Sequence, residues 1–103
     1  MKIIFTDTAK KHLKSIYQYY RKEASLKVAK SIKDNILTDI GKLKNHPQIG
    51  SEETFLSPLK QEYKKLVTGN YKVIYRIVDN YIVIDTLFDT RQEPKELLKK
   101  LKR

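Results

Sequence analysis

Cysteine is absent from this chain of 103 residues, and glycine occurs only three times. Without thiols the chain can form no disulfide, no thiolate metal site and no cysteine nucleophile. The three glycines are scattered, so there is no glycine-rich loop of the kind that binds phosphate. The two histidines, His12 and His46, lack carboxylates at a spacing that would complete a metal site. We therefore expect neither a metal nor another cofactor.

Long apolar segments are also absent. The first residues turn polar at Thr6, and no stretch approaches the roughly 18 apolar residues of a membrane-spanning helix. The N-terminus has no apolar core typical of a signal peptide. These features predict a cytoplasmic protein that does not enter a membrane.

Acidic residues are few compared with basic ones, and the formal net charge is +10. Such an excess suits a phosphate backbone, an acidic partner protein or an anionic membrane surface. It also suits a merely solubilising surface, because most of the excess is lysine rather than arginine. The length allows a single domain, residues 1–103, with a core of modest size.

Local patterns in the first half predict a strand followed by two helices. Residues 2–5 are apolar and β-branched, as in a strand. Thr6 or Thr8 can cap the first helix, and Ser25 the second, which ends before Pro47. Apolar residues recur at helical spacing at Ala9, Leu13, Ile16, Tyr17 and Tyr20, and again at Ala29, Ile32, Ile36, Ile40 and Leu43. The opposite face of the first helix carries Lys11, Lys14, Gln18 and Lys22.

After an irregular stretch at 46–61, the period of the pattern changes to that of strands. Residues 62–68, 71–78 and 81–90 are predicted as three strands, joined by two-residue turns at 69–70 and 79–80. Pro94 suits the first turn of a short basic C-terminal helix that carries Leu97, Leu98 and Leu101. The predicted fold class is α+β, in the order β-α-α-β-β-β, with a helical hairpin packed on an antiparallel sheet.

The two-residue turns set the register of the meander and so assign side chains to faces. The predicted pairs are Val78 with Tyr81, Arg76 with Val83, Ile74 with Asp85, and Lys72 with Leu87. One face is then nearly all apolar and packs on the helices: Leu66, Tyr71, Val73, Tyr75, Ile77, Ile82, Ile84, Thr86 and Phe88.

The other face of the meander gathers positive charge. We call it the cationic face, and its members are Lys65, Lys72, Arg76, Arg91, Tyr63 and Tyr81. A one-residue slip at 69–70 would exchange Lys65 for Lys64. Cations and aromatic rings on a sheet can hold phosphates, stack bases and stabilise the charge of a phosphorane, although no general base is evident. Alternatively, Arg76 and Asp85 form only a solvated cross-strand pair.

Several short stretches surround the helical hairpin and the meander in a defined order. They are Thr8-Ala9, the His46-Pro47…Gly50 loop, Leu66…Gly69-Asn70-Tyr71, the strand Tyr71-Lys72-Val73-Ile74-Tyr75-Arg76-Ile77, and Phe88-Asp89-Thr90-Arg91-Gln92-Glu93-Pro94. In this order and spacing the chain resembles the RelE/ParE superfamily, the toxins of bacterial type II toxin–antitoxin systems, over nearly its whole length. The superfamily contains RelE-like enzymes that cleave mRNA on the ribosome and ParE-like inhibitors of DNA gyrase.

The resemblance implies residues for each activity. In a RelE-like enzyme, Lys64 or Lys65, Lys72 and Arg91 would be the catalytic cations. The tyrosine expected soon after the last strand has no counterpart, because Leu97 is nearest to its position. The Arg91-Gln92-Glu93-Pro94 ending is closer to the ParE-like branch, which favours gyrase inhibition.

Both branches imply neutralisation by an antitoxin whose C-terminal segment wraps the toxin, and the net charge fits an acidic segment. The mRNA endonuclease remains the first alternative. A nucleic-acid-binding module without toxic activity is the second.

Overall fold

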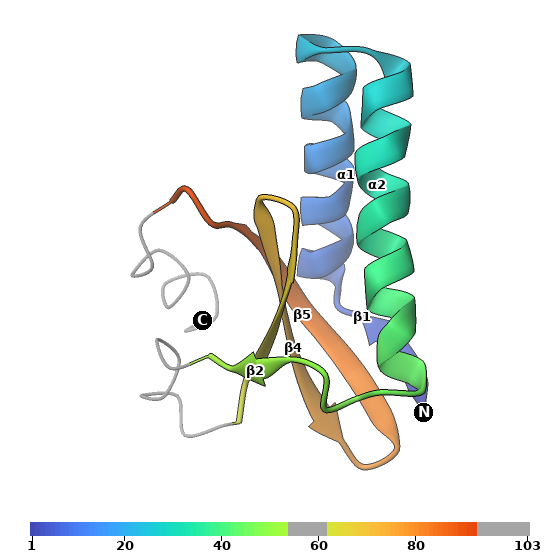
Figure 1. Cartoon of the computed structure of the whole chain (residues 1–103), viewed down its shortest axis with the longest axis vertical. Coiled ribbons are helices and arrows are strands. Elements are labelled where there is room, and N and C mark those ends of the chain that lie inside the picture. Colours follow the sequence, from blue (N-terminus) through green and yellow to red (C-terminus); the bar gives the residue numbers. More distant parts are fainter. Residues whose placement is uncertain (54–61, 93–103) are drawn as a thin grey trace.

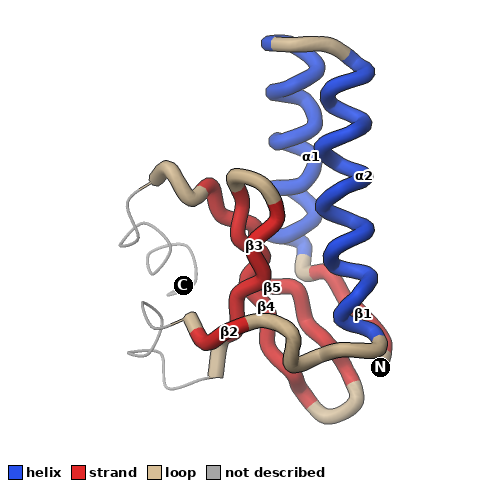
Figure 2. The backbone as a smooth tube through the Cα atoms, in the orientation of Figure 1, coloured by secondary structure: helices blue, strands red, loops and turns tan. Residues whose placement is uncertain are grey.

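The computed structural model describes residues 1–53 and 62–92. Two helices pack on a five-stranded sheet whose strand order is β1-β5-β4-β3-β2 (Figures 1 and 2). The elements are β1 (Lys2–Phe5), α1 (Asp7–Glu23), α2 (Leu26–Gly41), the 3-10 turn η1 (Lys42–Lys44), β2 (Ser51–Glu52), β3 (Lys64–Thr68), β4 (Tyr71–Val78) and β5 (Tyr81–Asp89). The predicted α+β class and order of elements are confirmed, and the predicted C-terminal helix lies outside the described residues.

A hydroxyl side chain begins each helix, as predicted. Thr6 Oγ1 accepts a hydrogen bond from the Ala9 amide at 3.1 Å, and Ser25 Oγ accepts one from the Val28 amide at 3.1 Å. Caps of this kind satisfy amides that have no partner within the helix, and each contributes about 1 kcal/mol. The Thr6 hydroxyl also donates to the Asp85 carbonyl at 2.8 Å, so the start of α1 is tied to β5.

The sheet is mixed rather than wholly antiparallel. The meander β3-β4-β5 is antiparallel as predicted, but β1 pairs with β5 in parallel. The predicted antiparallel sheet is therefore wrong for β1, because side chains of a short strand alternate between the two faces in the same way in either direction. The two-residue strand β2, which pairs with the start of β3, falls within the stretch that sequence patterns left irregular.

A β-bulge interrupts the pairing of β4 with β5, between Ile74 and Tyr75 on β4. From the turn to the bulge the predicted pairs Val78–Tyr81 and Arg76–Val83 are confirmed. Beyond it, Ile74 pairs with Thr86 rather than Asp85, and Lys72 pairs with Phe88 rather than Leu87. The predicted register is wrong there because β5 has nine residues against eight in β4, and the extra one is absorbed around Asp85.

The bulge changes the faces of the residues that follow it. Leu87, predicted outside the core, packs within it opposite Val73. Phe88, predicted inside the helix-facing core, lies on the other face beside Lys72. Thr86 turns toward α1, where its Oγ1 is 2.6 Å from His12 Nδ1.

The core lies between the sheet and the helices. Its buried members are the predicted Ala9, Ile16, Ile36, Ile40, Leu43, Tyr71, Val73, Tyr75, Ile82 and Ile84, together with Leu87. None of the helices in the described part of the chain has the length and apolar content needed to cross a membrane.

Tyr75 holds the loop between η1 and β2 against the sheet. Its hydroxyl donates to the Pro47 carbonyl at 2.9 Å and accepts from the Gly50 amide at 3.1 Å. A Cβ added at Gly50 would lie 2.5 Å from the Tyr75 hydroxyl and 2.6 Å from the Lys65 carbonyl oxygen. Glycine is therefore required at this position by close approach.

Gly50→Ala should lower the free energy of unfolding by about 1–3 kcal/mol, because the new methyl group meets backbone as well as a side chain. Gly41→Ala is the matched control. Gly41 lies in α2 with nothing within 4 Å of an added Cβ, so alanine there should raise stability by up to about 1 kcal/mol. Urea unfolding of both variants measures the difference. Equal effects would contradict the close approach at Gly50.

Candidate functional site

The turn between β3 and β4 decides which lysine of β3 faces away from the helices. Thr68 pairs with Tyr71, so residues 69–70 form the predicted two-residue turn, and Gly69 has a φ of 59°. Lys65 pairs with Ile74, while Lys64 pairs with the core residue Tyr75. Lys65 therefore lies on the sheet face turned away from the helices, as predicted, and Lys64 belongs to the helix-facing side.

We call the sheet face turned away from the helices the distal face. Its members are Tyr63, Lys65, Lys72, Ile74, Arg76, Tyr81, Asp85 and Phe88. This face is less open than predicted, because Ile74 and Phe88 are at most 1% exposed. Tyr81 is its most accessible aromatic residue, at 40%.

Lys72 is buried on the distal face beside a carboxylate. Its Nζ lies 2.5 Å from Glu53 Oε2, and the two residues are 8% and 2% exposed. Nζ is also 5.8 Å from the centroid of the Phe88 ring. A buried cation of this kind has lost its hydration and depends on its partner. Lys72 is therefore held in the structure and is not presented to solvent.

Arg76 and Asp85 form the predicted pair on the distal face. Arg76 Nε donates to Asp85 Oδ2 at 2.9 Å. Asp85 is only 7% exposed, so the alternative of a fully solvated pair is wrong. Burial raises the pKa of the Asp85 carboxyl, and Arg76 opposes that rise. Burial, followed by the charge of Asp85, also raises the pKa of Tyr63.

Arg91 does not join the cations of the distal face. Beyond the bulge the chain carries it to the α1 side, beside His12 and Ile16, where Asp89 binds it. Arg91 Nε donates to Asp89 Oδ1 at 2.9 Å and Nη2 donates to Oδ2 at 2.7 Å, while its backbone amide also donates to Oδ1. The predicted convergence of Arg91 with Lys65, Lys72 and Arg76 is wrong, because the extra residue in β5 reverses the side on which it emerges.

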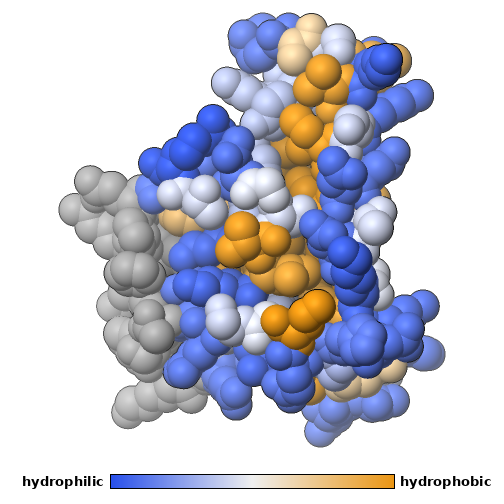
Figure 3. All heavy atoms as spheres, viewed as in Figure 1, coloured by the Kyte–Doolittle hydropathy of each residue, from blue (hydrophilic) through white to orange (hydrophobic). Residues whose placement is uncertain are grey.

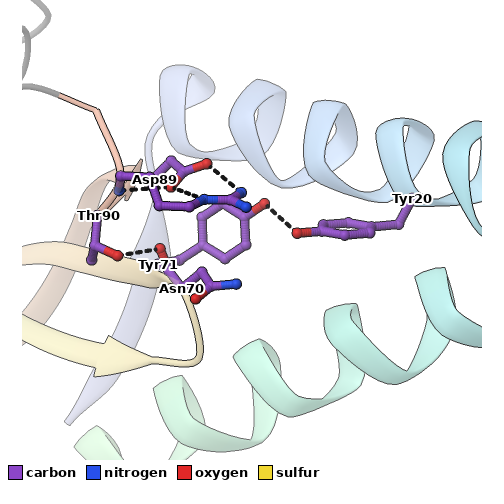
Figure 4. A network of polar contacts seen from close by, with 6 residues as sticks. Tyr20, Asn70, Tyr71, Asp89 and Thr90 are labelled. Atoms are coloured by element: carbon purple, nitrogen blue, oxygen red, sulfur yellow. Dashed lines mark hydrogen bonds and ion pairs between the residues drawn. The ribbon is translucent and has the colours of Figure 1, made fainter.

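A tyrosine pair links the end of the sheet to α1 beside Arg91. The Tyr71 hydroxyl donates to the Tyr20 hydroxyl at 3.3 Å (Figure 4). Burial first, and then this hydrogen bond, raise the pKa of Tyr71. Thr90 closes the end of the sheet by donating through its amide and its hydroxyl to the Asn70 carbonyl, at 2.8 and 2.9 Å.

Two hollows lie on either side of Tyr71. One, of about 310 Å³, lies between α2 and the β3–β4 turn and is lined by Ile32, Ile36 and Asp39. The other, of about 320 Å³, lies between α1 and the end of β5 and is lined by Ile16, Leu87 and Arg91. Both combine apolar and polar lining, which suits side chains of a partner protein.

The described residues contain no group of three or more His, Cys, Asp or Glu placed to hold a metal ion.

Sequence patterns did not predict the role of Glu53, because a single acid in an irregular stretch has no periodic partner. A signal for the bulge was present, since Asp85-Thr86 puts two polar residues in succession into an apolar strand.

Comparison with known proteins agrees with this geometry. A family model described as the ParE toxin of the type II toxin–antitoxin system parDE matches residues 3–94. The chain belongs to the ParE toxin family. The predicted resemblance to the RelE/ParE superfamily, nearer its ParE branch, is confirmed.

A solved structure, the chromosomal ParDE toxin–antitoxin system from P. aeruginosa, has the same fold as this ParE-family toxin. The TM-score is 0.74 at 18% sequence identity, over 86% of this chain and 95% of that one. No curated protein sequence matches the chain.

Lys72→Met should lower the free energy of unfolding by about 3–5 kcal/mol, because it removes the cation that contacts the buried Glu53 carboxylate. The double variant Lys72→Met with Glu53→Leu should recover most of this loss. Lys65→Met is the matched control, since Lys65 is only half-buried and should lose less than about 1 kcal/mol. Urea unfolding compares them, and equal losses in the two single variants would show that Lys72 has no structural role.

Tyr71→Phe should lower the free energy of unfolding by about 1 kcal/mol at neutral pH, because the hydrogen bond to Tyr20 is lost. The pKa of Tyr71 is raised above its ordinary 10.0 in the folded chain. Its stabilising contribution is therefore fully present below pH 10 and is lost as pH rises through the folded value. Thermal unfolding at a series of pH values should give a shallower alkaline loss for Tyr71→Phe than for wild type. The exposed Tyr81→Phe should leave the slope unchanged, and an unchanged slope in Tyr71→Phe would refute the assignment.

Proposed function

We propose that this ParE-family toxin arrests growth by binding and inhibiting DNA gyrase, and that it does not itself cut RNA. The observation that carries the proposal is the separation of Lys72 from Arg91. Lys72 is buried with Glu53 on the distal face, whereas Arg91 is bound by Asp89 on the α1 side. A target of this kind requires the toxin to act in the cytoplasm.

Cleavage of RNA needs cations that reach the reacting phosphate together. Of the three candidates, Lys65 and Lys72 are on one face of the sheet and Arg91 is on the other side. A protein that inhibits by binding needs only a complementary surface. The arrangement therefore supports inhibition over catalysis by Lys65, Lys72 and Arg91.

We propose further that an antitoxin, the second component named in the description of the family, neutralises this chain. Support comes from the net charge of +10, which attracts an acidic segment, and from the two hollows beside Tyr71. Figure 3 shows apolar surface running along the hairpin and over the middle of the molecule, between hydrophilic areas. An antitoxin segment with alternating apolar and acidic side chains would fit this surface.

The test of the target is a supercoiling assay with purified gyrase, relaxed plasmid and the purified toxin. Inhibition should increase with toxin concentration and disappear when the product of the neighbouring gene is added. Absence of inhibition, in toxin that still arrests growth, would reject gyrase as the target.

The same toxin should leave translated mRNA intact in a primer-extension assay on ribosomes. Cuts within the ribosomal A site that disappear in Arg91→Ala would instead establish the endonuclease. Salt-dependent binding to nucleic acid, with no growth arrest and no antitoxin, would establish the non-toxic module.

A further inference from the structure

The outer face of α1 carries a row of cations that neither the sheet nor the proposed antitoxin surface uses. At 100° per residue, Lys10, Lys11, Lys14, Arg21 and Lys22 fall within a sector of about 120°. The same sector contains only two other residues, Asp7 and Gln18. We call this row the α1 basic face.

Every residue of the α1 basic face is exposed. None of its five cations forms an ion pair with another residue of segments 1–53 and 62–92. The one acid, Asp7, is in the first turn, where it complements the positive end of the helix. Internal pairing therefore does not account for these charges, in contrast to Lys72, Arg76 and Arg91.

The geometry of the row suits a regular polyanion. From Lys10 to Lys22 the helix rises about 18 Å, at 1.5 Å per residue. The hairpin of α1 and α2 projects past the sheet, so this length is accessible along one side (Figure 2). DNA duplexes carry one negative charge per about 1.7 Å of axis, so several phosphates lie within reach of the row.

The composition of the face identifies the class of partner. It contains no apolar or aromatic side chain, so it offers neither the buried core of a protein interface nor a platform for unstacked bases. Lysine-rich charge along one helix face favours sequence-independent contact with phosphates. We propose that the α1 basic face binds the phosphate backbone of duplex DNA.

The choice of DNA over double-stranded RNA rests on the proposed function, because gyrase acts on DNA. In that setting the toxin would contact the DNA that gyrase holds, as well as the enzyme. Binding to naked duplex is measured without gyrase, so its failure is distinguishable from failure of gyrase inhibition.

The experiment measures fluorescence anisotropy of a labelled 20-base-pair duplex of mixed sequence, titrated with the purified chain at several salt concentrations. The test variant is Lys10→Gln/Lys14→Gln/Arg21→Gln. Glutamine has nearly the helix propensity of lysine and arginine, so the variant should fold, and far-UV circular dichroism checks this. The magnitude of the slope of log K against log salt should fall by about 2.7, at about 0.9 per lost phosphate contact. Affinity at low salt should fall at least tenfold.

The control is Lys2→Gln/Lys42→Gln/Lys44→Gln, which removes the same net charge. These lysines lie outside α1, on β1 and η1, and these two elements contact each other. The slope of log K against log salt for the control should differ from that of the wild type by no more than about 0.9, the change expected for one phosphate contact. Equal weakening by both variants would mean that net charge alone attracts DNA and would overturn the proposal.

Two further outcomes would also overturn it. One is tighter binding to double-stranded RNA of the same sequence than to DNA. The other is unchanged DNA binding in the test variant together with lost affinity for the antitoxin, which would assign the α1 basic face to that acidic partner.

Discussion

One extra residue in β5, absorbed at Asp85 and Thr86, decides on which side of the sheet the described residues after it lie. Without the bulge, Phe88 would face the helices and Arg91 would continue the row of cations on the distal face. With it, Leu87 fills the core opposite Val73, and Arg91 reaches the end of α1. The bulge also exposes the Asp85 carbonyl to the Thr6 hydroxyl, which links the cap of α1 to the same point of the sheet. The attachment of the α1 cap and the side on which Arg91 emerges thus both involve this single irregularity.

Sequence patterns predicted the parts of the fold that follow from periodicity and capping. Ser25 and Thr6 begin the helices, β4 has the predicted bounds, and the two-residue turn at 69–70 places Lys65 as expected. These features are local, so neighbouring residues suffice to specify them. Arg91 was misplaced because faces were extended through an unbroken alternation, and one residue of slip reverses every face that follows. The sequence does not predict the partner of Lys72, because Glu53 is 19 residues away along the chain and contacts Lys72 only in the folded structure.

Three cations in and beside the sheet are paired with acids. Lys72 has Glu53, Arg76 has Asp85 and Arg91 has Asp89, each within 2.9 Å. These pairs differ in burial, and their contributions to the stability of the fold differ accordingly. The Lys72–Glu53 pair is withdrawn from solvent and fixes the end of β2 to β4, while the Arg91 pair is exposed and screened. A face that looks catalytic in a linear sequence is therefore largely a set of structural contacts.

The pairing of these three cations also determines which positive charges of the protein are left to attract a partner. Because Lys72, Arg76 and Arg91 are each paired with an acid, the positive field around the described residues comes mainly from lysines and arginine on the helices. Long-range attraction depends on this unpaired charge, whereas affinity and specificity for a protein depend on apolar contacts that exclude water. The chain separates the two requirements in space. The α1 basic face supplies charge without apolar contact, and the hollows beside Tyr71 supply apolar contact with cations and acids both in their lining, so two different partners can engage the toxin without competing for the same residues.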